Sequence, residues 1–337
     1  MSIEILAPGW QTSVQDGGRH GHAALGVGAS GAMDCVALRL ANWLVGNADT
    51  AAALEITLRG PTLRFDADSL IALTGAPIPA RCGADELPMW RSVRVRAGCE
   101  LRLGTMPRGA YAYLAMGGGI DSAPVLGSRS ADINAGLGGA LVAGDVFPIL
   151  ASASGQNRDL WHMLGGRAHE ANSDNRSVSP ANWSLAPRAW FDTDPQRPLR
   201  VVEGAHFAQL DAASRRALFA TAFRISGDSN RVGYRLDGAK LQLRAPLEIV
   251  SAGVAAGTVQ LPPGGIPIAL MAEAPTCGGY PRIAHVIAVD LPRLAQRRPG
   301  DSLRFEPVSL DEAQTRYLER ERALISLART IMERLHG

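Results

Sequence analysis

Apolar and polar residues alternate with a period of two in several separate segments of the chain. These segments are 54–65 (LEITLRGPTLRF), 92–98 (SVRVRAG), 99–104 (CELRLG), 240–244 (KLQLR) and 302–308 (SLRFEPV). Successive side chains of a β-strand point to opposite faces, so this pattern predicts strands with one buried and one polar face. Such strands line barrels or sandwiches and are usually antiparallel. The chain is therefore expected to be mainly β.

Helical patterns are confined to a few segments. Asp34 is a suitable N-cap for an amphipathic helix over 35–47, and a second helix is expected over 206–221. Near the C-terminus, Ser309 and Glu312 fit a capping box that introduces a long amphipathic helix. That last helix can either pack on a barrel as a solvated element or dock a partner.

The length of 337 residues favours two domains over one. GAYAYLAMGGGIDSAPVLGSRS followed by LVAGDVFPIL weakly resembles GIPIALMAEAPTCGGYPRIAHVI followed by RRPGDSLRFEPV. Each stretch has an apolar strand, a glycine-rich turn and a closing Gly-Asp hairpin, which suggests two related β-barrels. We expect a first barrel over 1–155, a partly ordered linker over 156–198, a second barrel over 199–308 and a C-terminal helix over 309–337.

The expected linker is rich in Ser, Asn, Ala and Pro, which is typical of loops. It nevertheless contains Trp161, Trp183 and Trp190, half of the tryptophans of the chain. Large aromatic side chains are rare in disordered segments, so part of the linker is expected to pack against a domain.

Composition narrows the classes of partner. The net charge is +2, with 34 basic and 32 acidic residues, which argues against nucleic acid. No apolar run approaches the roughly 18 residues of a membrane span, and the N-terminus lacks the pattern of a signal peptide. The four cysteines show no CxxC spacing, so neither a zinc site nor a disulfide framework is predicted. Free thiols are typical of a reducing compartment, so a cytoplasmic location is expected.

The glycine-rich stretch QDGGRHGHAALGVGASGAMD, residues 15–34, is the first candidate site. It has no lysine and so cannot be a Walker-type loop. GVGASG matches the letters of a dinucleotide fingerprint, but no buried parallel strand precedes it. The histidines in the stretch lack a third metal ligand nearby, so no metal site is expected.

What remains in this stretch is a set of polar and charged groups that together could bind an anion. Gln15, Asp16 and Arg19 provide an amide, a carboxylate and a guanidinium group on one short turn. Ser30 and Asp34 flank the start of the expected helix, where backbone N–H groups favour an anion. The set could hold a carboxylate or phosphate of a small molecule; alternatively, Asp16 and Arg19 only pair to fix the loop.

A second candidate site is spread over the C-terminal half. NRVGYRL places Asn230, Arg231 and Tyr234 in one turn and strand, and GTVQLP places Gln260 on the face opposite its apolar neighbours. Close to the Gly278-Gly279 pair, which lets a backbone approach a ligand, lie Glu273, Thr276, Cys277 and Tyr280. Alternatively, each of these residues could simply complete the hydrogen bonds of a turn. No motif places a base beside Cys277, so this thiol is not expected to be reactive.

The chain resembles the KipA family, whose members are also called allophanate hydrolase subunit 2 or the C subunit of 5-oxoprolinase. The resemblance rests on long, ordered motifs: VQDGGRHGHAALGVGASGAMD, ALRLANWLVGN, LEITLRGPTLRF, VLGSRS, NRVGYRL, GTVQLPPGGIPIALM and GGYPRIAHVIAVDLPRLAQRRPGD. These motifs run from residue 14 to residue 301 and so cover nearly the whole chain.

The resemblance implies two cyclophilin-like β-barrels and, as partner, a KipI-like protein that forms the B subunit, with the active site near their contact. It implies the ATP-dependent opening of 5-oxoproline to glutamate, in which the B and C subunits phosphorylate the lactam and the A subunit opens it. Biotin enters only under a second reading, in which the chain is part of a carboxyltransferase acting on urea or a similar small amide. A third reading is a non-catalytic regulator that binds a KipI-like kinase inhibitor.

Under the first reading, arginines such as Arg231 would hold a carboxylate or a transferred phosphoryl group by bidentate contacts. Glu273 or Asp34 would act as the proton-transfer or orienting carboxylate. One segment departs from the family pattern, in which an aspartate, any residue and then Gln-Thr precede GGYP. This chain has AEAPTCGGYP, with Glu273 for the aspartate and Pro275 for the glutamine. The loss of that amide puts the identity of the substrate in question.

Overall fold

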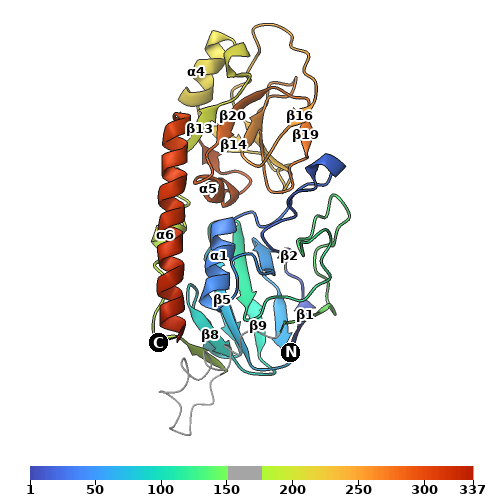
Figure 1. The fold of residues 1–337 in the computed structure, drawn as a ribbon, viewed down its shortest axis with the longest axis vertical. Coiled ribbons are helices and arrows are strands. Elements are labelled where there is room, and N and C mark those ends of the chain that lie inside the picture. Colours follow the sequence, from blue (N-terminus) through green and yellow to red (C-terminus); the bar gives the residue numbers. More distant parts are fainter. Residues whose placement is uncertain (151–176, 337) are drawn as a thin grey trace. The chain divides into compact units, whose positions relative to one another are not determined.

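Strands dominate the structure, a computed structural model that describes residues 1–150 and 177–336 (Figure 1). The chain divides into two compact units, each assembled from separate pieces of sequence. Unit 1 consists of Met1–Gly18, Asp34–Phe191 and Leu324–Gly337, and unit 2 of Arg19–Met33 and Asp192–Ala323. The predicted mainly β architecture is confirmed, whereas the predicted domain boundaries stay a prediction.

Unit 1 is built on two six-stranded sheets. The first has the order β11 (Val146–Pro148), β1 (Ser2–Ala7), β4 (Thr62–Phe65), β9 (Glu100–Leu103), β6 (Ala80–Cys82) and β7 (Asp85–Glu86). The second has the order β12 (Val178–Pro180), β8 (Ser92–Val95), β5 (Ser69–Gly75), β10 (Tyr111–Met116), β3 (Ala53–Thr57) and β2 (Gln11–Gln15).

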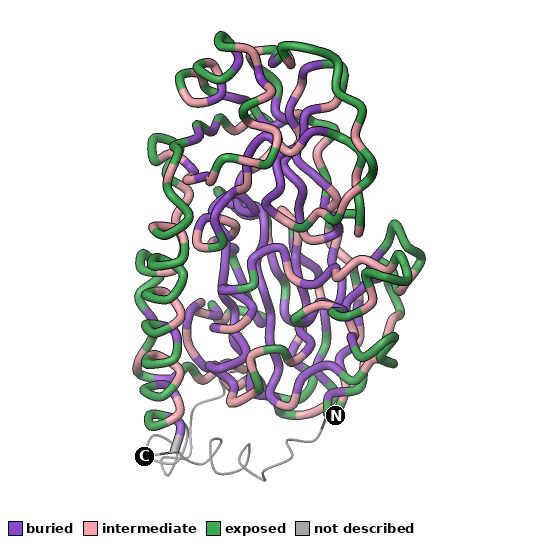
Figure 2. The backbone as a smooth tube through the Cα atoms, turned by 45° about the horizontal axis from the view of Figure 1, so that its top comes forward, coloured by how far each residue is buried: buried purple, intermediate pink, exposed green. Residues whose placement is uncertain are grey.

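A single hydrophobic cluster fills the space between the two sheets of unit 1. Ile3, Ile5 and Leu63 enter it from the first sheet, and Leu54 and Leu114 from the second. Ile3, Ile5, Leu54 and Leu63 belong to alternating stretches, because in a strand every second residue faces the same side, whereas Leu114 lies in a strand that is buried throughout. Figure 2 shows the buried positions running along these strands. The opposite face of the second sheet is covered in part by α1 (Cys35–Leu44), whose Ala37 carbonyl accepts a hydrogen bond from Thr74 Oγ1 at 2.7 Å.

Unit 2 is built on one eight-stranded sheet. Its order is β21 (Ser302–Leu303), β14 (Phe223–Ile225), β15 (Gly233–Asp237), β18 (Ile268–Leu270), β17 (Thr258–Gln260), β20 (Arg282–Val286), β13 (Leu199–Glu203) and β22 (Phe305–Pro307). A separate two-stranded sheet pairs β16 (Ala252–Gly253) with β19 (Cys277–Gly278). The helical segments are η1 (Ala23–Leu25), η2 (Phe207–Gln209), α4 (Ala212–Ala220) and α5 (Leu291–Ala295).

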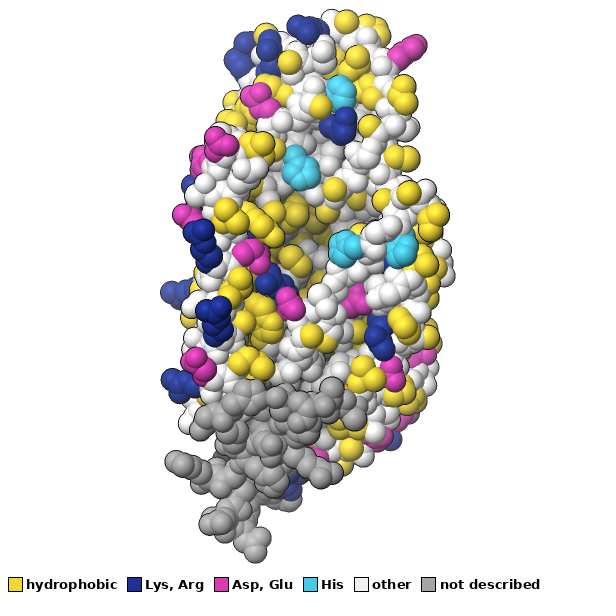
Figure 3. Space-filling model, viewed as in Figure 1, with side chains coloured by type: hydrophobic (Ala, Val, Ile, Leu, Met, Phe, Trp, Pro, Cys, Tyr) yellow, Lys and Arg dark blue, Asp and Glu magenta, His cyan; other side chains and the backbone are white. Residues whose placement is uncertain are grey.

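The long C-terminal helix α6 (Leu310–His336) agrees with the sequence prediction. Ser309 Oγ accepts a hydrogen bond from the backbone N–H of Glu312 at 3.1 Å, as its N-cap role requires. Leu324, Ile331 and Leu335 are buried at helical spacing, while most of the helix is exposed (Figure 2). Figure 3 shows acidic and basic side chains interspersed along it, which is typical of a solvated helix face.

Two local predictions of secondary structure need correction. Residues 240–244 form no strand and make only one isolated bridge, between Leu243 and Leu210, because a turn-rich stretch gives them no partner strand. The helix expected over 206–221 is split into η2 and α4, and Asp211 caps the second part by accepting from Ser214 N at 2.6 Å.

Residues 177–198 of the expected linker lie within the described part of the chain. β12 pairs with β8 through Val178 and Val95, and α3 (Pro187–Trp190) follows. Trp183 and Trp190 are half-buried, whereas Trp161 lies outside the described residues.

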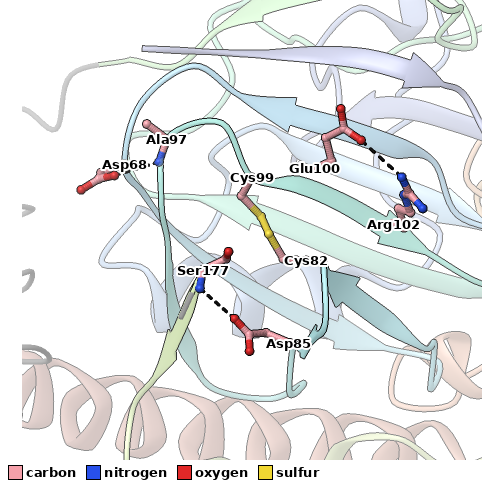
Figure 4. The surroundings of a disulfide bond; sticks show 8 residues. All are labelled: Asp68, Cys82, Asp85, Ala97, Cys99, Glu100, Arg102 and Ser177. Carbon is pink, nitrogen blue, oxygen red and sulfur yellow. Dashed lines mark hydrogen bonds and ion pairs between the residues drawn. A yellow bond between two sulfur atoms is a disulfide. The ribbon is translucent and has the colours of Figure 1, made fainter. Parts of the chain in front are cut away.

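The cysteine prediction is wrong for one pair, because Cys82 and Cys99 form a disulfide with a Cα–Cα distance of 5.9 Å (Figure 4). Cys82 ends β6 and stands opposite Leu101 of β9, so Cys99 is a diagonal neighbour on the same face. This proximity depends on the strand register, which spacing along the chain does not reveal. Cys35 and Cys277 are exposed and outside the disulfide.

No helix among the described residues combines the length and the apolar character that crossing a membrane would require.

Candidate functional site

A chain of buried polar groups crosses the face of the second sheet of unit 1 that α1 covers. Tyr113 and Glu55 are cross-strand neighbours, and the Tyr113 hydroxyl donates to Glu55 Oε2 at 2.6 Å. The same hydroxyl accepts from the backbone N–H of Asp34 at 2.7 Å, and Asp34 Oδ1 accepts from Ala37 N at 3.0 Å. Burial and the nearby charges of Glu55 and Asp34 raise the pKa of Tyr113 well above its ordinary value.

Gln15 continues this polar face on the neighbouring strand. Ser13 stands opposite Glu55 in the register, and Gln15 Nε2 donates to Ser13 Oγ and to the Ala131 carbonyl, each at 3.0 Å. Gln15 is 1% exposed, and its Oε1 has no hydrogen-bond partner among the described residues. The predicted residues Gln15 and Asp34 are therefore both buried at this polar face, Gln15 from β2 and Asp34 from the N-cap of α1.

Asp16 fixes the loop that follows β10. Its carboxylate accepts from Ser128 Oγ at 2.7 Å, Ser130 Oγ at 2.6 Å, Arg129 N at 2.6 Å and Gly18 N at 2.8 Å. Burial would raise the pKa of Asp16, but these hydrogen bonds outweigh burial and lower it. The Asp16 carboxylate is thus fully engaged and positions the VLGSRS segment rather than facing an open site.

Several groups in unit 1 were missed by the sequence analysis. Alternation marks Glu55 as a polar position and so predicts exposure, but the residue is 1% exposed because α1 covers that face. Tyr113 lies in an apolar strand and gave no polar signal. Ser128 and Ser130 lie more than a hundred residues from Asp16 in sequence, so only tertiary structure joins them.

Unit 2 brings together two of the predicted catalytic residues. Arg231 Nε donates to Glu273 Oε1 at 2.6 Å, and Arg231 Nη2 donates to the Gly31 carbonyl at 2.6 Å. The two side chains are 7% and 2% exposed. The guanidinium group of Arg231 is therefore buried and holds two segments of unit 2 together.

The other predicted residues near this pair have mainly structural contacts. Asn230 Oδ1 accepts from Val232 N at 2.9 Å, and the Tyr234 hydroxyl donates to the Ala295 carbonyl at 3.0 Å. Arg19 is buried, with its backbone N–H donating to the Ala29 carbonyl at 2.6 Å, and Ser30 adopts a left-handed conformation with φ 52°. The groups predicted from residues 15–34 are thus divided between the two units.

A third cluster lies on the face of β17 and β20 opposite to Val259. Thr258 and Gln260 share this face, since the buried Val259 between them points the other way. In the register, Thr258 is opposite His285 and Gln260 is opposite Arg282. Thr258 Oγ1 and His285 Nδ1 are 3.3 Å apart, and burial lowers the pKa of His285.

The departure from the family pattern lies next to this cluster. Pro275 is exposed, so a glutamine amide at this position would reach solvent unless the turn moved. Thr276 is half-buried, and Tyr280 is 45% exposed. No hydrogen bond described here connects Thr276 or Tyr280 with the Arg231–Glu273 pair, so their roles as substrate-binding residues stay a prediction.

The described residues contain no group of three or more His, Cys, Asp or Glu side chains arranged to hold a metal ion.

Comparison with known proteins shows the family to which this chain belongs. Residues 25–307 match the family described as carboxyltransferase domain, subdomain A and B. The C subunit of 5-oxoprolinase from Escherichia coli is 38% identical over 94% of this chain and 96% of that protein. The corresponding C subunit from Haemophilus influenzae is 34% identical over 98% of this chain and 99% of that protein.

Longer proteins contain the same domain. The Saccharomyces cerevisiae urea amidolyase is 31% identical over 99% of this chain but only 18% of its own length. The Kluyveromyces lactis urea carboxylase structure is similar, with a TM-score of 0.78 and 29% identity over 93% of this chain and 28% of that chain. The structure of TTHA0988 has a TM-score of 0.74 and 32% identity over 90% of this chain and 55% of that chain. The chain therefore belongs to the carboxyltransferase domain, subdomain A and B family, in which it is similar along nearly its whole length to the C subunit of 5-oxoprolinase.

Proposed function

We propose that the chain is the C subunit of a 5-oxoprolinase-type complex that opens 5-oxoproline to glutamate at the expense of ATP. The observation that carries this proposal is the end-to-end match to two proteins named as the C subunit of 5-oxoprolinase, which covers 96% and 99% of their lengths. The complex would include a KipI-like protein in the place of the B subunit, together with an A subunit. A cytoplasmic location belongs to the same proposal.

The nucleotide would be bound mainly by a partner. Lys240 is the only lysine in the sequence, it is exposed, and no glycine-rich phosphate loop precedes it. This chain therefore does not supply the lysine of a Walker-type site. Its role would be to bind and orient the lactam for activation.

Within unit 2, the Arg231–Glu273 pair would position neighbouring segments of the chain and would not contact the substrate itself. Arg231 already donates to Glu273 and Gly31, and these contacts tie the segment 19–33 to the turn after β18. Asp16 would similarly position the VLGSRS loop in unit 1.

A carboxyltransferase role is the second candidate, and the family description and the urea carboxylase structure favour it. The sequence shows no biotinyl-lysine motif, so carboxybiotin would have to arrive on another protein. Urea amidolyase is matched over only 18% of its length, whereas the C subunit of 5-oxoprolinase is matched nearly completely, so we favour the first function.

The test is reconstitution with the separately purified A and B subunits. We expect ATP-dependent glutamate release from 5-oxoproline with all three proteins, and none from this chain alone. The parallel reaction supplies a carboxybiotin donor with urea and measures carboxylated product. The proposal would be rejected if glutamate were released without this chain, or if urea were carboxylated and no glutamate were released.

A further inference from the structure

The side-chain amide of Gln260 is buried without a complete set of hydrogen bonds. Gln260 is 4% exposed, and its Nε2 has no hydrogen-bond partner among the described residues. Buried amide donors are nearly always paired, because an unpaired one bears the full cost of desolvation. An orphaned donor in a cluster of polar groups is a position where a ligand or a water can supply the missing acceptor.

A small separate sheet covers this amide. In the strap, defined as residues 252–253 and 277–278, Ala252 pairs with Gly278 and Gly253 pairs with Cys277. A Cβ at position 278 would lie against Gln260 Nε2, so Gly278 of the strap lies directly over the amide.

The strap is weakly attached to the eight-stranded sheet, with which its strands form no ladder. Arg282 Nη1, from β20, donates to the Gly253 carbonyl at 3.2 Å, whereas the bond from Val254 N to the Thr276 carbonyl joins the two segments of the strap to each other. A hydrogen bond from one side chain is a small attachment, so local opening needs little disruption.

The groups around Gln260 are suited to an oxygen-rich small molecule. Arg282 is its cross-strand neighbour and carries a guanidinium group that suits a carboxylate. Thr258 adds a hydroxyl two residues along the same strand face. Because burial lowers the pKa of His285, the imidazole beside Thr258 is neutral at pH 7.

We propose that Gln260 is the recognition residue for a small cyclic amide, and that Arg282 binds the carboxylate of that ligand when the strap lifts. This inference deepens and rests on the proposed function. A primary carboxamide presents its N–H and C=O side by side. A lactam has its own N–H and C=O cis, so the two amides can form a cyclic pair with two hydrogen bonds. An open-chain secondary amide is trans and cannot do so.

The ligand series follows from this geometry. 5-Oxoproline has both the cis amide and the carboxylate, 2-pyrrolidone has only the cis amide, and N-acetylglycine has a trans amide with a carboxylate. We expect affinity to fall in the order 5-oxoproline, 2-pyrrolidone, N-acetylglycine, with the last not binding measurably. Urea, which also offers N–H and C=O on one side, should bind weakly because it lacks the carboxylate.

Cys277 provides a reporter on the strap. An environment-sensitive fluorophore is attached to Cys277 in a Cys35→Ser variant, and the reverse arrangement, a fluorophore on Cys35 in Cys277→Ser, is the control. Each titration is performed on the full chain with and without the KipI-like protein. We expect a saturable signal with 5-oxoproline from Cys277 and no signal from Cys35.

The decisive variant is Gln260→Met, which keeps the length of the side chain but removes the amide. Binding of 5-oxoproline should weaken about tenfold or more, because the cyclic pair is lost. Thermal stability should be unchanged or higher, because an unpaired buried donor has been removed. A purely structural glutamine would give the opposite result, with lower stability and unchanged binding. Gln242→Met, at an exposed glutamine of unit 2, is the matched control and should change neither property.

The outcomes separate this inference from the proposed function. Three results would overturn the inference. They are no Cys277 signal either with or without the KipI-like protein, an affinity for N-acetylglycine equal to that for 5-oxoproline, or unchanged binding of 5-oxoproline by Gln260→Met. Glutamate release in the reconstituted complex would still support the function in those cases. Conversely, lactam binding through Gln260 without turnover in the complex would reject the function and retain the site.

Discussion

Arg231 and Glu273, 42 positions apart in sequence, form a buried ion pair with an Nε–Oε1 distance of 2.6 Å. The pair is closed by a second bond from Arg231 to the Gly31 carbonyl. Both residues were predicted to share a site, and the structure brings them together. Because each side chain is engaged by the other, the pair serves to hold that site in shape.

Arg231→Lys tests this role. A lysine keeps the charge but cannot donate to Glu273 and Gly31 with the fixed geometry of a guanidinium group. We expect a loss of about 2 kcal/mol in the free energy of unfolding, since disrupting buried ion pairs is costly. Urea denaturation gives the value, and Arg235→Lys, at an exposed position of β15, should cost less than about 0.5 kcal/mol. Equal stability of the two variants would contradict the buried pair.

Asp16→Asn should loosen the loop over residues 125–132. The amide cannot accept from two hydroxyls and two backbone N–H groups as the carboxylate does, so we expect a loss of about 2–3 kcal/mol. Urea denaturation and hydrogen exchange of the loop amides measure it. Asp121→Asn removes an exposed ion pair with Arg129 and should cost less than about 1 kcal/mol.

The charge on Asp16 also gives a pH dependence. Its pKa is lower in the folded chain than in the unfolded chain, so the contribution is present above the unfolded value of about 3.9. Stability from this group should be lost as the pH falls through the lower folded pKa. A parent protein and an Asp16→Asn variant with identical acid unfolding would speak against the assignment.

Tyr113→Phe removes the hydroxyl that connects Glu55 with the N-cap of α1. Glu55 then loses a donor and the Asp34 N–H loses an acceptor, both in a buried position, so we expect a loss of about 2–3 kcal/mol. Thermal unfolding measures the change. Tyr317→Phe, on an exposed part of α6, is the control and should leave the midpoint unchanged within error.

The disulfide between Cys82 and Cys99 should be detectable by alkylation. Of the four cysteines, we expect only Cys35 and Cys277 to be alkylated in denaturant without reductant. The bond closes a loop with a sequence separation of 17, so Cys82→Ala with Cys99→Ala should cost about 3 kcal/mol. Alkylation of all four thiols in protein purified without reductant would show that the bond is not formed.

His285 should make the fold sensitive to mild acid. Burial lowers its pKa, so below about pH 6.5 the unfolded chain takes up a proton more readily than the folded chain does. Stability therefore falls as the pH drops from about 7 to 5, and His285→Gln should reduce that slope. His206 also has a lowered pKa, from burial and from Arg282, so His206→Gln shows the remaining contribution. A slope unchanged in His285→Gln would exclude this histidine as the source.

The alternation of residues determined the strands and the mainly β class. LEITLRGPTLRF became β3 and β4, and Asp34 capped α1 as its side chain required, because these features depend on neighbours along the chain. The family motifs were equally readable, since they lie in continuous segments. KLQLR had the same alternation but no partner strand, so the pattern alone was insufficient there.

Tertiary structure alone decided which polar residues are buried and what they contact. Glu55 is covered by α1, Asp16 meets Ser128 and Ser130 from a distant loop, and Cys99 reaches Cys82 through the register of β6 and β9. The amide of Gln260 is buried because Gly278 of the strap lies over it. Spacing in sequence gives the face of a strand on which a residue lies. What covers that face depends on packing between segments far apart in the chain, and that packing sets the partners, the burial and the pKa of each group.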